Sequence, residues 1–231
     1  MSPSGARRPD PRPALREAAE RLSRAYEGVF GRETVERFLG ETYAELASRS
    51  TVPSLLPRQT EAFARQRLQA LARVEGRDPL PGRPVVLFLC VHNAGRSQMA
   101  LGLFTRLAGS RAQGWSAGSE PVGGVHPVAV DAMRRRGIDI SGEFPKPWTD
   151  EVVRAADVVV TMGCGDACPV YPGKRYVDWP LPDPDGQDLD AVCRIRDEIE
   201  RRVRGLLVEL GVSEEPEGGG GAVMTRPEPE T

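Results

Sequence analysis

The sequence is poor in several features that mark particular classes of protein. No apolar run approaches the roughly 20 residues that a helix needs to cross a bilayer, so we expect no membrane span. The opening residues, MSPSGARRPDPRP, contain arginines but no apolar stretch, and we therefore expect no secretory signal. The formal net charge is only -2, which by itself predicts no affinity for nucleic acid or membranes. A cytoplasmic protein is the resulting expectation.

Cysteine is also scarce, with 4 in 231 residues. In a cytoplasmic protein we do not expect these cysteines to form structural disulfides. Zinc is not expected either, because the C-x3-C pair of Cys164 and Cys168 lacks the usual spacing and a second pair of ligands. Catalytic, redox or buried roles are then left for the cysteines. Cys193 lies in a long amphipathic pattern, and we expect it to be a small packing residue.

The part of the chain before residue 77 carries helical patterns and no chemical motif. A Pro- and Arg-rich segment at 1–13 predicts a disordered tail. Three short amphipathic patterns at 14–76 then predict a small three-helix bundle. Docking on the rest of the protein, self-association and binding of a redox partner are all possible roles for it. The Gly- and Pro-rich stretch at 77–84 predicts a linker, and 213–231 predicts a second, acidic disordered tail.

From 85 to 212 the hydrophobic pattern changes to strands that alternate with helices. The run VVLFLC is continuously apolar, as is typical of a central parallel strand buried on both faces. Further strand and helix patterns follow it, with strands at 114–119, 157–163 and 174–179 and helices at 97–108, 126–137 and 189–210. This alternation predicts an α/β sheet.

The motif CVHNAGRS directly follows the strand VVLFLC and precedes a helix, where α/β sheets place their ligands. Its centre, 93–95, can form a tight, partly left-handed turn whose backbone N–H groups point at one anion beside a helix N-terminus. Arg96 would grip two oxygens of that anion through its planar fork. The same surroundings would favour ionisation of the Cys90 thiol. The alternative is a buried cysteine at a strand end, near a surface arginine.

CVHNAGRS resembles the phosphate-binding loop of the low-molecular-weight protein tyrosine phosphatase superfamily, and most closely its arsenate reductase branch of the actinobacterial type with an N-terminal helical domain. The resemblance extends over 84–211. It includes, in order, RSQMA, SAGSEP, VHPVAVDAMRRRGIDIS, DVVVTMGCGDACP, the Asp-Pro of LPDPDG, and IRDEIERRV. The fold that it implies is a four-stranded parallel sheet flanked by helices, preceded here by the three-helix bundle.

The resemblance also implies roles for single residues. Cys90 would be the nucleophile, Arg96 the oxyanion clamp and Asp183 the general acid. Asp183 has a plainer alternative as the first residue of a turn, in which case Asp185 would be the acid. The oxyanion-binding loop would contain Val91, His92, Asn93, Ala94, Gly95, Arg96 and Ser97, with Asn93 and Ser97 as its organisers. We expect His92 to face the surface and His126 to be structural.

The loop does not separate a reductase from a phosphatase, because arsenate and phosphate are nearly alike in shape and charge. A reductase must pass two electrons from sulfur to arsenic, so a second thiol has to attack the first sulfur. In the relay that the family suggests, Cys164 attacks Cys90 and releases arsenite, and Cys168 then attacks Cys164. The segment 163–173 would have to change conformation to allow this. The alternative is that both are incidental thiols in a turn.

The resemblance implies no bound cofactor, but it implies an external reductant. Thioredoxin would reduce a Cys164–Cys168 disulfide, whereas some actinobacterial relatives use mycothiol with mycoredoxin and need only the first cysteine. Phosphate or sulfate would compete with arsenate. Two other functions stay open: a low-molecular-weight protein tyrosine phosphatase, and a binding module that senses an oxyanion.

Some relatives hold a potassium ion beside the loop through a glutamate at the position that Leu101 occupies here. We hypothesise that the ammonium group of Lys146 takes the place of that cation and tunes the Cys90 thiol. The alternative is a solvated loop lysine.

Overall fold

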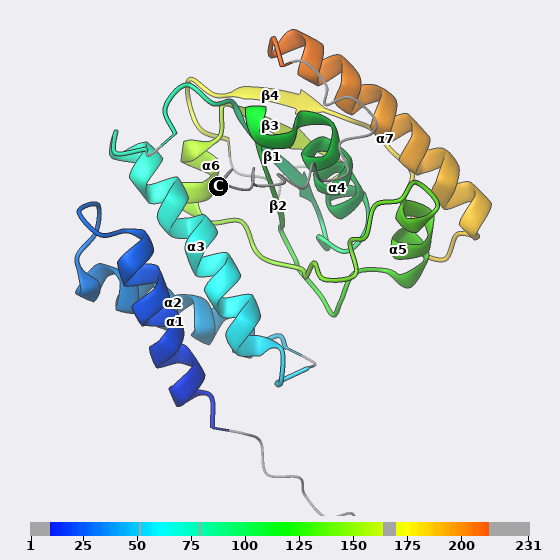
Figure 1. Cartoon of the computed structure of the whole chain (residues 1–231). Coiled ribbons are helices and arrows are strands. Elements are labelled where there is room, and N and C mark those ends of the chain that lie inside the picture. The colour runs from blue at the N-terminus through cyan, green and yellow to red at the C-terminus, as the bar shows by residue number, and fades with distance from the viewer. Residues whose placement is uncertain (1–9, 51, 79, 164–169, 213–231) are drawn as a thin grey trace, which may run out of the picture.

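The computed structural model describes residues 10–50, 52–78, 80–163 and 170–212 (Figure 1). In chain order the helices and strands are α1 (Arg12–Ala25), α2 (Arg32–Ala47), α3 (Leu56–Val74), β1 (Val85–Cys90), α4 (Arg96–Ala108), a 3-10 turn (Gly109–Arg111), β2 (Gln113–Gly118), α5 (Pro127–Arg134), α6 (Asp150–Ala155), β3 (Val158–Thr161), β4 (Arg175–Asp178) and α7 (Leu189–Glu209). No helix among these described residues is long and apolar enough to cross a membrane.

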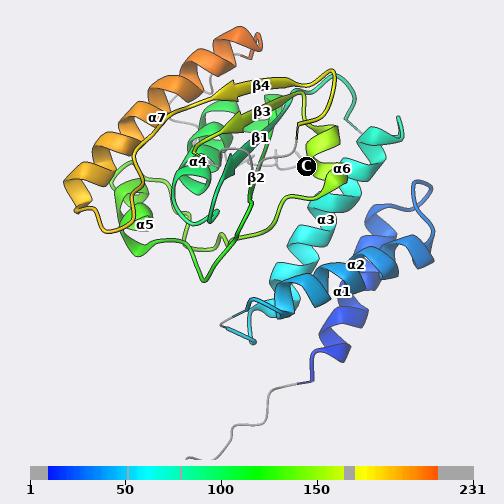
Figure 2. The same cartoon turned by 180° about the vertical axis from the view of Figure 1, so that it is seen from behind.

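The four strands form one parallel sheet in the order β2-β1-β3-β4. Leu87 of β1 lies between Trp115 of β2 and Val159 of β3. Helices α4, α5 and α7 cover one face, and α6 and α3 cover the other (Figures 1 and 2). The four-stranded parallel sheet flanked by helices, which the family resemblance implied, is therefore confirmed.

Both faces of strand β1 are covered, which explains why its sequence is apolar throughout. Val86, Phe88 and Cys90 belong to the apolar cluster under α4, α5 and α7. The alternate residues Val85, Leu87 and Leu89 belong to the cluster on the opposite face. Because successive side chains of a strand point to opposite faces, both sets must be apolar when both faces are covered. Cys90 is thus placed at the carboxyl end of the central strand, as the sequence predicts.

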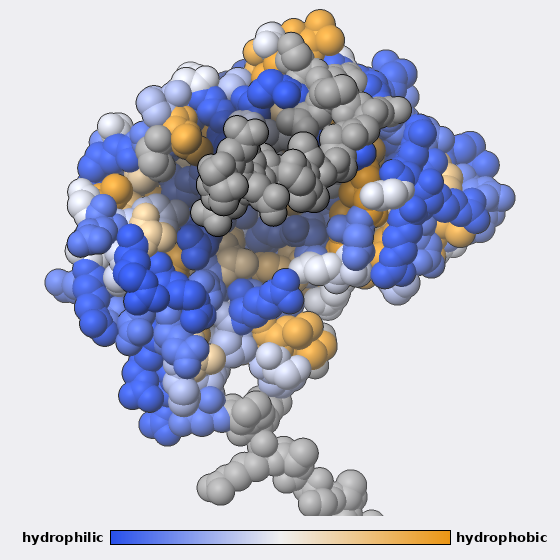
Figure 3. Space-filling view, viewed as in Figure 1, coloured by the Kyte–Doolittle hydropathy of each residue, from blue (hydrophilic) through white to orange (hydrophobic). Residues whose placement is uncertain are grey.

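Helix α3 packs against α1 and α2 on one side and against the sheet and α6 on the other. It lies between α1, α2 and the sheet in both views (Figures 1 and 2). Ala64 and Leu68 are in the core of the helical unit, by which we mean α1 to α3. Ala70 is in the cluster against the sheet. The visible face of the helical unit is largely hydrophilic (Figure 3), because its apolar side chains are turned inward. The division into a three-helix domain at 14–76, a linker and a catalytic domain at 85–212 stays a prediction.

Charged groups reinforce the contact between α3 and the part of the protein that contains the sheet. Arg67 of α3 donates to Glu151 of α6 at 2.6 Å and to Thr42 of α2 at 3.0 Å. Arg73 donates to Asp157, which also accepts the backbone N–H of Val85 at 2.8 Å. Of the roles left open for the helical unit, docking on the rest of the protein is the one observed.

Apart from shifts of a few residues at the ends of several elements, the structure differs from the sequence expectations at one helix start and in one additional helix. Helix α1 begins at Arg12, inside the stretch 1–13 that we expected to be a tail, because Pro13 fits the first turn of a helix where its missing N–H costs nothing. Helix α6 was not predicted, since its six residues are too few to show a helical period. The rest of the expected tails, at 1–9 and 213–231, lies outside the described residues.

Candidate active site

The loop that follows β1 turns sharply before α4 begins at Arg96. Asn93 has φ of 50°, and it is the one non-glycine residue with positive φ in the described part of the chain. Asparagine tolerates this left-handed conformation better than most residues. The partly left-handed turn expected from the sequence is therefore present, and Asn93 makes it.

The buried side chain of Asn93 holds the turn together. Its Nδ2 donates to Ser97 Oγ at 2.8 Å, and its Oδ1 accepts the backbone N–H of Lys146 at 2.9 Å. Ser97 Oγ in turn lies 2.9 Å from Cys90 Sγ. The sulfur and the loop backbone are thus connected through two side chains that water does not reach. These contacts are the ones that the expected organising roles of Asn93 and Ser97 would use, and the roles themselves stay a prediction.

The loop is also braced by the segment after β2. Glu120 N–H donates to Val91 O and His126 N–H donates to Ala94 O, both at 2.8 Å. A Cβ on Gly118 would lie 2.6 Å from Val91 O and 3.0 Å from Asn93 N, so only glycine fits there. The motif SAGSEP therefore supports the loop, and His126 has the structural place expected of it.

Arg96 is the point where three distant segments meet. Its guanidinium is buried, with 7% of the residue exposed. It donates to the Asp183 carboxylate and, at 3.2 Å, to the carbonyl of Leu181. A Cβ on Gly163 would lie 3.0 Å from Arg96 Nη1, so the chain just before Cys164 passes beside the guanidinium. The end of β3 and the LPDPDG turn are therefore both brought to the loop.

The contact between Arg96 and Asp183 is accompanied by a close approach of the neighbouring residues, Gly95 and Pro184. A Cβ on Gly95 would lie 2.6 Å from Pro184 Cγ, which means that Pro184 packs directly on the loop. Asp183 also accepts the backbone N–H of Asp185 at 3.0 Å, so it starts the turn as well as pairing with Arg96. Asp185 points instead toward His126, at 3.8 Å, and its side chain is 70% exposed. Of the two candidate acids, Asp183 is the one in contact with Arg96.

These features agree with the family comparisons. The family "Low molecular weight phosphotyrosine protein phosphatase" matches residues 85–215, and "Protein-tyrosine-phosphatase-like, N-terminal domain" matches 15–72. The chain belongs to the low molecular weight phosphotyrosine protein phosphatase family.

Its similar proteins include named arsenate reductases. A solved thioredoxin-dependent arsenate reductase of Corynebacterium glutamicum is 45% identical, with a TM-score of 0.74, and the match covers 85% of this chain and 96% of that one. An arsenate reductase of Halalkalibacterium halodurans is 40% identical over 132 residues, which is 53% of this chain and 94% of that protein. A glutaredoxin arsenate reductase of Synechocystis is 36% identical over 128 residues, 54% of this chain and 97% of that protein.

Lys146 is not the solvated loop lysine of the alternative interpretation, because only 4% of it is exposed. Its ammonium donates to Phe144 O at 3.2 Å and to Glu143 at 3.3 Å, and lies 4.6 Å from the centre of the Phe144 ring. Burial lowers the pKa of Lys146, and Glu143 offsets part of that effect. Its influence on the Cys90 thiol stays a prediction.

Gln98 is a supporting residue that the sequence analysis missed. It is fully buried, and its Nε2 reaches Asn93 O at 3.0 Å, Asn93 Oδ1 at 3.2 Å and Phe144 O at 3.0 Å. Ser116 donates to its Oε1 at 3.4 Å. One sequence signal could have found it. A glutamine among the apolar residues of a core-facing helix is expected to be buried, and a buried amide needs hydrogen-bond partners.

Of the three remaining cysteines, the structure describes only Cys193. Cys164 and Cys168 lie outside the described residues, so their proposed relay is untested by the geometry. Cys193 is partly buried on α7 and packs against the main core, as expected of a packing residue. Among the described residues there is no group of His, Cys, Asp and Glu side chains that could hold a metal ion.

Proposed function

We propose that this protein is an arsenate reductase. The loop 91–97 binds arsenate through its backbone N–H groups and the Arg96 fork, and Cys90 attacks the arsenic. The observation that carries this proposal is the meeting of three segments at Arg96: the Cys90 loop, Asp183, and Gly163, which precedes Cys164. The similarity to arsenate reductases supports it.

The first step forms an S–As bond between Cys90 and arsenate. An arsenate oxygen leaves as water, with Asp183 supplying a proton. In the structure the Asp183 carboxylate pairs with Arg96. An incoming oxyanion would compete for the same guanidinium, which would release the carboxyl group to face the departing oxygen. The pairing therefore holds the acid next to the place where its proton is needed.

The second step is the reduction. Cys164 attacks the Cys90 sulfur, an S–S bond forms and the S–As bond breaks. The electron pair of that bond goes to arsenic, which leaves as arsenite. Cys168 then attacks Cys164, freeing Cys90 and leaving a Cys164–Cys168 disulfide. The order of the thiols is the one that the family resemblance implies. The position of Gly163 beside Arg96 supports Cys164, the next residue in the chain, as the first of the two to react.

We propose thioredoxin as the external reductant, because the Corynebacterium glutamicum relative is a thioredoxin-dependent enzyme and matches 85% of this chain. Mycothiol with mycoredoxin is the competing choice, and phosphate and sulfate are the proposed competing anions. We propose the cytoplasm as the compartment of the reaction, because thiols stay reduced there and the relay needs a supply of reducing equivalents.

Steady-state arsenate reduction tests the proposal. Wild type, Cys164→Ser and the matched control Cys193→Ser are each assayed with the thioredoxin system and, separately, with mycothiol plus mycoredoxin. The relay predicts that wild type and Cys193→Ser turn over with thioredoxin and that Cys164→Ser does not. Full activity of Cys164→Ser with thioredoxin would refute the relay.

The phosphatase alternative has one observation in its favour, namely that the loop and the Arg96–Asp183 pair would serve phosphate as well as arsenate. Hydrolysis of an aryl phosphate by wild type, without any arsenate reduction under either reductant system, would favour it over the reductase.

A further inference from the structure

The helical unit makes a second contact with the rest of the protein, away from the contact between α3 and α6. Leu46 of α2 and Leu56 and Phe63 of α3 form a small apolar cluster. The fourth buried member is Phe144, which lies in the segment between α5 and α6. The ring of Phe144 is therefore held by side chains of the helical unit rather than by the core under the sheet.

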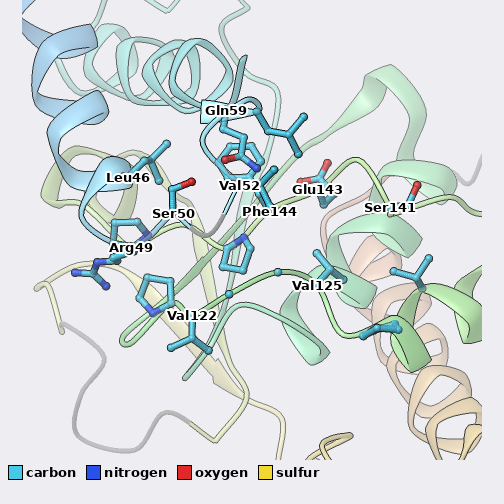
Figure 4. Close-up of a pocket in the computed structure, with 18 of the residues that line it drawn as sticks. Leu46, Arg49, Ser50, Val52, Gln59, Val122, Val125, Ser141, Glu143 and Phe144 are labelled. Carbon is cyan, nitrogen blue, oxygen red and sulfur yellow. The ribbon is translucent and has the colours of Figure 1, made fainter. Parts of the chain in front are cut away.

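Phe144 also borders a pocket of about 400 Å³ between the two parts of the molecule (Figure 4). Leu46, Val52 and Gln59 line it on the side of the helical unit, and Val122 and Val125 line it on the other. The surroundings of Phe144 are thus partly open. If the apolar cluster lost a side chain, Phe144 would have room to shift.

The carbonyl group of Phe144 accepts two buried donors. Gln98 Nε2 lies 3.0 Å from it and Lys146 Nζ lies 3.2 Å from it. Gln98 is fully buried and Lys146 nearly so, and each would lose a buried partner if Phe144 moved. The ring of Phe144 also covers the ammonium group of Lys146.

The same two residues hold Asn93. Gln98 Nε2 donates to the backbone carbonyl of Asn93, and the backbone N–H of Lys146 donates to its side-chain oxygen. The left-handed conformation of Asn93 is tolerated by asparagine but still less favourable than a right-handed one, so these buried hydrogen bonds stabilise it. Asn93 then sets Ser97, and Ser97 contacts the Cys90 sulfur.

We infer that the helical unit positions the anion-binding loop, by holding Phe144 in place under Gln98 and Lys146. Phe63 and Phe144 are positioning residues, since neither touches the anion or Cys90. For the identity of the substrate the inference rests on the proposed function, but the positioning itself concerns any tetrahedral oxyanion in the loop. It can therefore be tested with inorganic phosphate.

The test compares Phe63→Ala with wild type in the full chain. Cys90 is alkylated with iodoacetamide at increasing phosphate, and its modification is followed by mass spectrometry. We expect the phosphate concentration that gives half protection to rise about tenfold in Phe63→Ala, within the usual range of coupling between distant sites. In arsenate reduction the same variant should raise KM more than it lowers kcat.

The matched control is Leu22→Ala, which truncates a fully buried residue in the separate core of the helical unit. It should lower the Tm yet leave phosphate protection within about twofold of wild type, because its cluster does not include Phe144. Phe63→Leu should restore most of the protection. If Phe63→Ala does not fold, Leu46→Ala replaces it, because Leu46 belongs to the same cluster as Phe144 and its truncation should weaken protection in the same direction.

Equal protection of wild type, Phe63→Ala and Phe63→Leu would overturn the inference, as would an equal loss in Phe63→Ala and Leu22→Ala. Failure of the proposed function gives a different result. In that case wild type would not reduce arsenate, while phosphate would still protect Cys90 and Phe63→Ala would still weaken that protection.

Discussion

The two sides of the candidate active site differ in burial and in the number of hydrogen bonds that hold them. On one side Cys90, Asn93 and Ser97 are buried and joined by hydrogen bonds, and the loop is braced from β2 and from Lys146. On the other side Asp183 lies on a turn, and its side chain is 50% exposed. The proposed anion cradle is therefore preorganised, while Asp183, the proposed proton donor, is attached to it through Arg96 and Pro184.

This difference separates two tasks. Preorganised donors bind developing charge without having to reorganise during the reaction. A proton donor must exchange protons with water between turnovers, and an exposed carboxyl group can do so. Substitutions of the buried groups that bind the anion or shape its loop should therefore alter both anion binding and turnover. Substitution of the attacking Cys90 sulfur, or of the exposed acid, should alter turnover alone.

The largest effect is expected for Cys90→Ser. Arsenate reduction should fall by at least about 10⁴-fold, because a serine hydroxyl is a poor nucleophile and cannot supply electrons to arsenic. Phosphate binding, measured by calorimetry, should survive since the cradle is intact. Appreciable arsenite production by this variant would mean that another cysteine begins the reaction.

Arg96→Lys should lower kcat/KM for arsenate by about 10²- to 10³-fold, because an ammonium group cannot form the two-pronged contact of a guanidinium. The variant should also weaken phosphate binding, as expected of a change on the buried side. Arg106→Lys, an exposed substitution on the same helix, is the control and should behave like wild type. Similar kinetics for the two variants would speak against Arg96 as the clamp.

Asp183→Asn is expected to lower kcat by about 10²-fold through loss of the proton donor. Phosphate protection of Cys90 should be nearly unchanged, which is the signature that sets the exposed side apart. Asp185→Asn is the matched control, and it should stay within about twofold of wild type because its carboxyl group faces His126. If Asp185→Asn were the more damaging change, the acid would have to be reassigned.

The smallest effect is expected from substitution of Lys146, the buried lysine whose backbone N–H binds Asn93. The pKa of Lys146 is lowered by burial, so between that lowered value and the ordinary lysine pKa of 10.5 the unfolded chain binds more protons than the folded one. Wild type should therefore gain stability relative to Lys146→Met as the pH rises through this window. Urea unfolding of both proteins at several pH values measures the gap, and a constant gap would contradict a lowered pKa.

The same variant tests whether Lys146 tunes the nucleophile. If the ammonium favours the Cys90 thiolate, alkylation of Cys90 in Lys146→Met should require a higher pH than in wild type. Identical pH profiles would leave Lys146 with its backbone bond to Asn93 as its contribution to the cradle.

The sequence predicted those parts of the structure that depend on local pattern. The strand VVLFLC and the turn at Asn93 could be predicted because burial on both faces and a left-handed turn each restrict the residue types allowed. The pairing of Arg67 with Glu151 could not be predicted, since the two residues lie 84 positions apart. The burial of Lys146 could not either, because its ammonium contacts Glu143 and Phe144 in an irregular loop that has no period to show which side chains are buried. Gln98 shares this difficulty, as its three acceptors lie on two separate segments.

A single turnover without an external reductant tests the central claim most directly. The fully reduced chain is mixed with arsenate, arsenite is counted, and the cysteines are mapped by mass spectrometry. The relay predicts one arsenite per chain from wild type together with a disulfide that includes Cys164, and none from Cys90→Ser or Cys164→Ser. Arsenite from Cys90→Ser, or its absence in wild type while aryl phosphate is hydrolysed, would contradict the account.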